Sequence, residues 1–209
     1  MKQTFLLAII LALLIVPCVA QVDKSKIILT GKILKYDKNE LKLEFNLENK
    51  SDKSIYVTTN PNQQNAQLGY YLLLNETDNS VMQISSHVYP HCITGSCPYT
   101  DDTRVKLTKL KSGESFSDNV HIKFPVKETI PPNGDPYKNK KIIPQKVKQI
   151  EISIGYFFEE QGILDFLKVK PFGWYINGNA KVFSGANKDK LFLEIQNLAS
   201  INIPFVKMK

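Results

Sequence analysis

The sequence predicts a mostly β, antiparallel sandwich with a short C-terminal helix and strand elaboration. Residues 40–48 alternate strictly, with Leu41, Leu43, Phe45 and Leu47 separated by polar side chains. A period of two is typical of a strand with one face on a core and the other in water. Similar short segments, separated by turn residues, recur up to residue 156, and none of them has a helical period.

The first two expected strands form a hairpin. Residues 26–36 begin with apolar and β-branched side chains, and Gly31 in their middle predicts a bulge or bend. Asp37, Lys38 and Asn39 are turn residues, so we expect residues 26–36 to pair antiparallel with residues 40–48. The polar residues 49–54 then form a turn into the next strand at residues 55–57.

Further strands are expected wherever apolar residues cluster or alternate between turns. They lie at residues 70–74, 81–84, 105–107, 120–124 and 146–156. The intervening segments 59–67, 85–103 and 125–145 are expected to be loops, because they are polar, proline-containing or both.

The last fifty residues change character. Ile163, Leu164, Phe166 and Leu167 recur at spacings of three and four, which predicts a short amphipathic helix over residues 159–168, weakened by Gly162. Residues 191–195 and 201–205 alternate again, and Pro204 favours an edge strand. We therefore expect one domain over residues 21–209, with a core at 26–156 and a C-terminal elaboration at 157–209.

The N-terminus has the pattern of a cleaved secretory signal over residues 1–20. A positive start precedes an unbroken apolar run at residues 5–16, and Ala20 ends a small-residue processing region. An uncleaved anchor helix is the alternative. Cys18 stands where bacterial lipoproteins are acylated, although Pro17 replaces the small residue of that pattern. We expect a secreted, periplasmic or cell-envelope protein that meets the membrane only through a lipid on Cys18.

The charge of the chain does not favour nucleic acid as a partner. The net charge is +7, and Arg104 is the sole arginine. Nucleic-acid readers usually cluster arginine and lysine on one face, because a guanidinium binds phosphate in a bidentate way. The lysines here are spread singly among glutamates, which is typical of a solubilising surface.

Reactive side chains concentrate in residues 85–102. Because Cys92 and Cys97 form an even pair in an exported chain, we expect them to form a disulfide that closes a short loop. The alternative is a zinc or copper site built from His87, His91, Cys92 and Cys97, although their spacing matches no established ligand pattern. We expect no cofactor.

The sequence contains no motif that indicates an enzyme. It lacks the Gly-x-Ser-x-Gly elbow, the His-Glu-x-x-His helix and a phosphate-binding glycine loop. Ser86 and His87 cannot join Asp101 in a triad if they lie on a strand, because adjacent strand residues face opposite ways. Aromatic residues make good binding anchors, and the candidates are Trp174, Tyr175, Tyr89 and Tyr99. The alternative for Trp174 is that it caps the core.

Two turns carry a resemblance to known proteins. A strand that ends in Asn49 precedes a polar turn, and the Leu-x-x-Gly-Glu-Ser turn of residues 110–115 separates two later strands. In this the chain resembles bacterial immunoglobulin-like sandwiches over residues 27–156. The resemblance implies an architecture and no particular activity. We expect an exported, non-catalytic binding or adhesion-type module whose partner is an extracytoplasmic protein or surface ligand. The alternative is an envelope metal-binding protein that uses residues 87–97.

Overall fold

A computed structural model describes residues 26–59, 70–87, 106–129, 140–170, 173–176 and 195–205, with the backbone alone for residues 165, 166, 168–170 and 173–176. These residues are mostly in strands, and no helix among them reaches seven residues. No helix in these ranges has the length and apolar character needed to cross a bilayer. The expected signal segment and Cys18 lie outside the described residues.

The strands follow one another with short connections or undescribed segments between them. In chain order they are β1 (Ile27–Tyr36), β2 (Glu40–Asn49), β3 (Ile55–Thr59), β4 (Tyr71–Leu74), β5 (Val81–Ser86), β6 (Lys106–Leu110), β7 (Ser115–Lys123), β8 (Val126–Lys127), β9 (Lys141–Ile142), β10 (Gln149–Phe158), β11 (Leu167–Lys170), β12 (Gly173–Ile176) and β13 (Asn197–Pro204).

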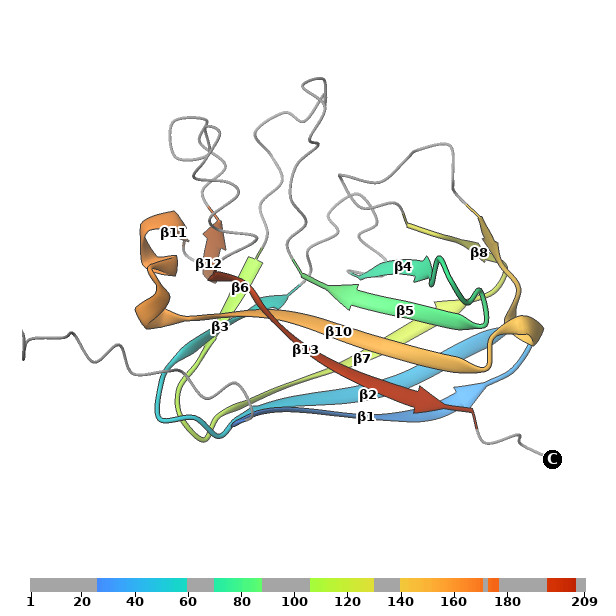
Figure 1. Ribbon diagram of the computed structural model, residues 1–209, viewed down its shortest axis with the longest axis horizontal. Helices are drawn as coiled ribbons and strands as arrows, with labels where there is room; N and C mark the ends of the chain where they lie inside the picture. The colour runs from blue at the N-terminus through green and yellow to red at the C-terminus, as the bar shows by residue number, and fades with distance from the viewer. Residues whose placement is uncertain are drawn as a thin grey trace, which may run out of the picture.

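The strands form two main sheets that pack face to face (Figure 1). One sheet has the order β1-β2-β7. The other has the order β11-β12-β6-β3-β10-β5-β4, and β13 pairs with the opposite edge of β10. The short pair β8-β9 lies beside them. The predicted mostly β class is confirmed, and the arrangement fits a sandwich.

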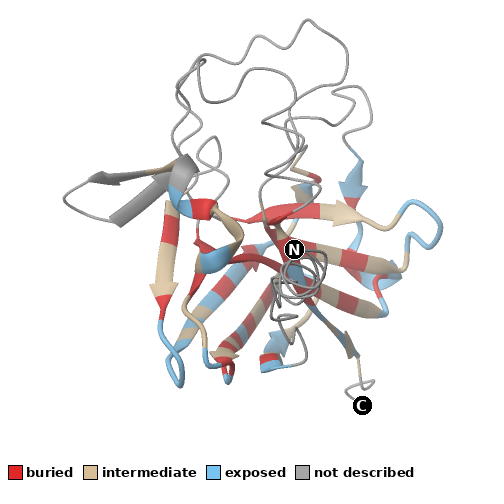
Figure 2. Ribbon diagram, turned by 60° about the vertical axis from the view of Figure 1, so that its left-hand side comes forward, coloured by how far each residue is buried: buried red, intermediate tan, exposed pale blue. Residues whose placement is uncertain are grey.

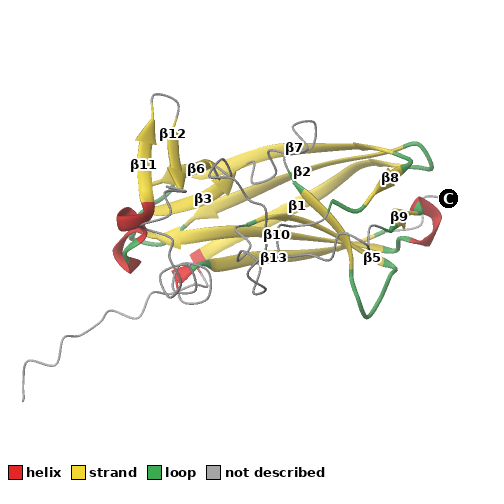
Figure 3. Cartoon of the chain, turned by 90° about the horizontal axis from the view of Figure 1, so that it is seen from above, coloured by secondary structure: helices red, strands yellow, loops and turns green. Residues whose placement is uncertain are grey.

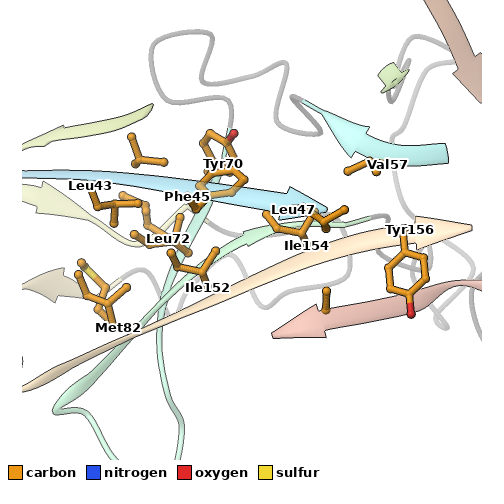
Figure 4. Close-up of a cluster of buried hydrophobic side chains, with 14 of the residues drawn as sticks. Leu43, Phe45, Leu47, Val57, Tyr70, Leu72, Met82, Ile152, Ile154 and Tyr156 are labelled. Atoms are coloured by element: carbon orange, nitrogen blue, oxygen red, sulfur yellow. The ribbon is translucent and has the colours of Figure 1, made fainter. Parts of the chain in front are cut away.

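The core lies between the two sheets. The predicted inward residues of β2 are buried, with Leu41, Leu43 and Leu47 at 0% exposure, and the alternation of buried and exposed residues is visible along the strands (Figure 2). From the other sheet, β10 contributes Ile152 and Ile154, also fully buried, and these side chains meet those of β2 (Figure 4). Burial of aliphatic and aromatic side chains is the main force that holds the layers together.

The predicted β1–β2 hairpin is confirmed, but its predicted bulge is in the wrong place. The Asp37 carboxylate accepts hydrogen bonds from the backbone N–H groups of Asn39 and Glu40, which closes the turn. The register shifts between Ile33 and Lys35, not at Gly31. Gly31 instead lies where the sheets approach closely, since a Cβ there would come 2.8 Å from a terminal methyl group of Ile203.

One strand pair is parallel, which the sequence did not predict. β5 runs parallel to β10 from the pair Val81–Gln149 to the pair Ser86–Ile154. β3 pairs antiparallel with the next part of the same edge, at residues 156–158. The two strands therefore meet end to end on β10 beside Gly155, where a Cβ would come 2.6 Å from the Cβ of His87. The small residue at this position makes that junction sterically feasible.

The buried side chain of Asn49 joins the two turns that suggested the immunoglobulin-like resemblance. Its amide nitrogen donates to the carbonyl oxygens of Lys53, Leu110 and Lys111, at 2.8, 3.2 and 3.1 Å. Its side-chain oxygen accepts from both the N–H and the hydroxyl of Ser51. A strand that ends in asparagine therefore fastens the following turn to the turn at residues 110–115.

The predicted C-terminal helix is wrong. In place of a helix over residues 159–168, the chain forms two single 3₁₀ turns, Glu159–Gln161 and Ile163–Phe166, and β11 begins directly after them at Leu167 (Figure 3). Gly162 separates the turns in a left-handed conformation with φ of 83°, which interrupts a continuous helix. The expected strand at 201–205 is confirmed as part of β13, and Pro204 ends it. Residues 191–194 lie outside the described part of the chain.

Candidate functional site

One surface depression lined entirely by described residues is an open groove on the outer face of the three-stranded sheet. It is lined by residues 30–32 of β1, 44–46 of β2 and 117–119 of β7, and its volume is about 280 Å³. We call these nine residues the polar groove. Ligand pockets usually measure roughly 300–1,000 Å³, so the groove lies just below this range and has room for a small ligand only.

The strand register explains the shape of the polar groove. Thr30, Asn46 and Ser117 are aligned across the three strands and form one row. Lys32, Glu44 and Asn119 form the next row on the same face. Because side chains on one face of a strand repeat every second residue, the rows stand about 7 Å apart. The backbone of the intervening residues 31, 45 and 118 forms the floor.

The first row is held in place by hydrogen bonds between its own members. The Ser117 hydroxyl donates to the side-chain oxygen of Asn46 at 2.8 Å. The Thr30 hydroxyl donates to the Asn46 backbone carbonyl at 3.3 Å. These contacts leave the Asn46 amide N–H groups, and the whole side-chain amide of Asn119, without a partner among the described residues. The polar groove therefore offers both donors and acceptors to a ligand.

The charges in the polar groove nearly cancel. Lys32 and Glu44 are cross-strand neighbours of opposite sign, yet they form no ion pair in this part of the structure. Only the backbone of Asp118 belongs to the floor, since its side chain lies on the inner face with that of Phe45, where the carboxylate accepts a hydrogen bond from the Tyr70 hydroxyl. Burial, followed by the bond to Asp118, raises the pKa of Tyr70 above its usual value, so the hydroxyl stays protonated as a donor.

A charged cluster lies on the same outer face, toward the β1–β2 turn. Glu40 contacts Lys35 at 2.6 Å, His121 at 2.7 Å and Lys42 at 3.4 Å. The hydrogen bonds from Lys35 and then His121 lower the pKa of Glu40 to about 2. Ser117 is four residues from His121 along β7, or about 13 Å in an extended strand, which is too far for a serine–histidine hydrogen bond.

The predicted loop site can be examined only at its first residue. His87 follows β5 and packs against Gly155, as the close approach of their Cβ positions indicates. Cys92, Cys97, His91, Tyr89 and Tyr99 lie outside the described residues, so the disulfide and the metal site both stay predictions. Within the described ranges, no group of three or more metal-ligating side chains comes together.

Two of the predicted aromatic anchors, Trp174 and Tyr175, lie in the same sheet as β5, the strand that precedes His87. Trp174 and Tyr175 lie in β12, where they pair with Leu107 and Lys106 of β6. β6 pairs in turn with β3, where Leu107 is opposite Thr58. The Ser86 hydroxyl, one residue before His87, donates to the Thr58 carbonyl at 2.7 Å. β12, which contains Trp174 and Tyr175, and β5, which ends one residue before His87, thus belong to one sheet.

Sequence reasoning did not find the polar groove. Each of its polar residues occupies the expected outward position of an alternating strand, which by itself indicates only a solvated face. The signal available in the sequence was weak: Asn46 is a short, uncharged residue on β2, whose other outward positions are lysine and glutamate. Only the register, which is not local in sequence, aligns the polar residues of the three strands.

No protein family model, curated protein or solved structure matches this chain. Its function is therefore inferred from its own residues.

Proposed function

We propose that this protein is an exported, non-catalytic binding module that acts outside the cytoplasm. The observation that carries the proposal is the polar groove, an open depression of about 280 Å³ in which the Asn46 amide N–H groups and the Asn119 side-chain amide have no partner among the described residues. These side chains stand on three paired strands whose opposite face is buried in the core. Strands position side chains more precisely than loops do, which favours selective binding.

Two features support binding over catalysis. The hydroxyl of Ser117 donates to Asn46, and His121 of the same strand lies about 13 Å away and is bound to Glu40, so these two residues do not form a nucleophile–base pair. A nucleophile needs such a base at hydrogen-bonding distance. Export is supported by the N-terminal pattern of residues 1–20, and the partner is then a surface ligand or an extracytoplasmic protein.

A thermal-shift panel tests the proposal. The exported chain is heated with neutral sugars, phosphates, amino acids or polyamines, and the double variant Asn46→Ala/Asn119→Ala is treated in the same way. A ligand at ten times its Kd stabilises the folded state by about 1.4 kcal/mol, which raises the Tm by roughly 3–6 °C. We expect a shift with wild type that disappears in the double variant.

The matched control is Ser115→Ala, which removes a polar side chain from the same face of β7 outside the polar groove. This variant should keep the full shift. A shift that survives in the double variant would move the binding site elsewhere. Conversion of any bound compound into a product, measured by mass spectrometry, would contradict the non-catalytic assignment. Intact mass of the exported chain reports cleavage after Ala20 and any lipid on Cys18.

A further inference from the structure

We infer that the ligand of the polar groove is an uncharged polyhydroxyl compound, of which a short neutral glycan is the representative. This inference rests on the proposed binding function and names the ligand class. It follows from the kinds of side chain that line the polar groove and from the hydrogen bonding of the strand backbone beneath them.

The lining matches hydroxyl groups better than it matches ions. Asn46 and Asn119 supply amide donors, and Glu44 and the Asn119 side-chain oxygen supply acceptors. A sugar hydroxyl both donates and accepts, so it can use both kinds of group at once. Lys32 would attract an anion, but Glu44 directly beside it would repel the same anion, so the pair offers little net attraction to an ion of either sign. The polar groove is therefore close to neutral, although the whole chain carries a net charge of +7.

The floor and walls disfavour peptides and lipids. β2 is hydrogen-bonded to β1 on one edge and to β7 on the other, so its backbone is not available to pair with a peptide strand. The outward side chains that form the two rows are polar or charged, so apolar contact is limited to their methyl and methylene groups and to the floor, with no continuous apolar channel for an acyl chain.

The dimensions fit a small ligand. β1 and β7 are separated by two strand spacings, or about 10 Å, and the two rows are about 7 Å apart. That footprint covers roughly one to two sugar rings. Because the polar groove is open and its two rows contain no aromatic ring for stacking, we expect weak binding, with Kd on the order of 1 mM.

Ligand-observed NMR titration tests the ligand class on the full exported chain. The uncharged compounds are N,N′-diacetylchitobiose, cellobiose and maltose, and the anions are inorganic phosphate and glucuronic acid. We expect at least one uncharged disaccharide to bind with a Kd that changes little as salt is raised, because no ion pair is formed. Asn46→Ala should weaken this binding about threefold to tenfold, and Ser115→Ala should leave it unchanged.

The double variant Lys32→Gln/Glu44→Gln separates the two ligand classes. Since glutamine at position 44 keeps an acceptor but loses the charge, binding of the uncharged disaccharide should weaken about threefold to tenfold and persist, whereas binding of anions, which depends on Lys32, should be lost. If only the anions bind, and this variant abolishes their binding, the inferred ligand class is wrong while the proposed binding function stands. If neither class binds in a way that depends on Asn46, both the inferred ligand class and the assignment of binding to the polar groove are wrong.

Discussion

Replacement of Asn49 by alanine should destabilise the fold strongly, because this one side chain joins two turns. The side chain is 0% exposed, and its amide donates to three carbonyl oxygens while its oxygen accepts twice from Ser51. Each buried hydrogen bond contributes about 1 kcal/mol net, and its loss leaves the partner unsatisfied. With two amide hydrogens and the contacts to Ser51 lost, we expect a decrease of about 3 kcal/mol in the free energy of unfolding.

For a domain of this size that loss corresponds to a decrease in Tm of roughly 6–12 °C. Urea unfolding followed by circular dichroism measures the free energy. The matched control is Asn75→Ala, since Asn75 closes a similar turn by accepting from Thr77 and Asp78, but in a partly exposed position. This control should cost less than about 1 kcal/mol.

Asn49→Asp tests whether position 49 needs a hydrogen-bond donor, because it replaces the amide with a carboxylate of nearly the same shape. The variant keeps the shape but sets a carboxylate against three carbonyl oxygens, so it should be at least as unstable as the alanine variant at neutral pH. Protonation in mild acid restores one donor and should recover part of the loss. If Asn49→Ala were no less stable than Asn75→Ala, the reasoning about the joint between the turns would be refuted.

Three further substitutions test other parts of the structure. Gly155→Ala should lower the free energy of unfolding by about 1–3 kcal/mol, and by more than Gly31→Ala does. The added methyl group would meet the His87 backbone at position 155, whereas its closest contacts at position 31 are the flexible ends of isoleucine side chains. Equal losses in urea unfolding would contradict this. Glu40→Gln should be less stable than wild type above pH 4.5, and this difference should shrink as the pH falls toward about 2, because the folded state favours the ionised form of Glu40. A stability difference that does not change with pH in this range would contradict the expectation. Tyr70→Phe should cost about 1–3 kcal/mol by leaving the Asp118 carboxylate without its hydroxyl donor, and an unchanged urea midpoint would contradict that.

The sequence predicted the local parts of the fold well. Strict alternation identified β2 and β10, and the turn residues Asp37–Asn39 identified the hairpin, because both signals lie within a few neighbouring residues. The C-terminal helix was wrong because Gly162 adopts a left-handed conformation, and the apolar spacing there serves two separate 3₁₀ turns. The alternation in β10 also predicts that Ser153 faces water, yet this residue is only 9% exposed.

The candidate site could not be predicted in the same way. The polar groove depends on the alignment of residue 30 with residues 46 and 117, and that register is fixed by core packing across the whole sheet. The parallel pairing of β5 with β10 was missed for the same reason, since strands far apart in sequence choose partners by packing. Cysteine and histidine are easier to recognise in a sequence as candidates for chemistry, and for this reason a disulfide or a metal site was predicted at residues 87–97.

The most direct test of the account is an amide chemical-shift map of the exported chain with the uncharged disaccharide that binds it best. If the polar groove is the binding site, the amides whose chemical shifts change cluster at residues 30–32, 44–46 and 117–119. These changes should be absent in Asn46→Ala/Asn119→Ala. Perturbations confined to the other sheet, or a titration that leaves these nine amides unmoved at saturation, would contradict the central claim.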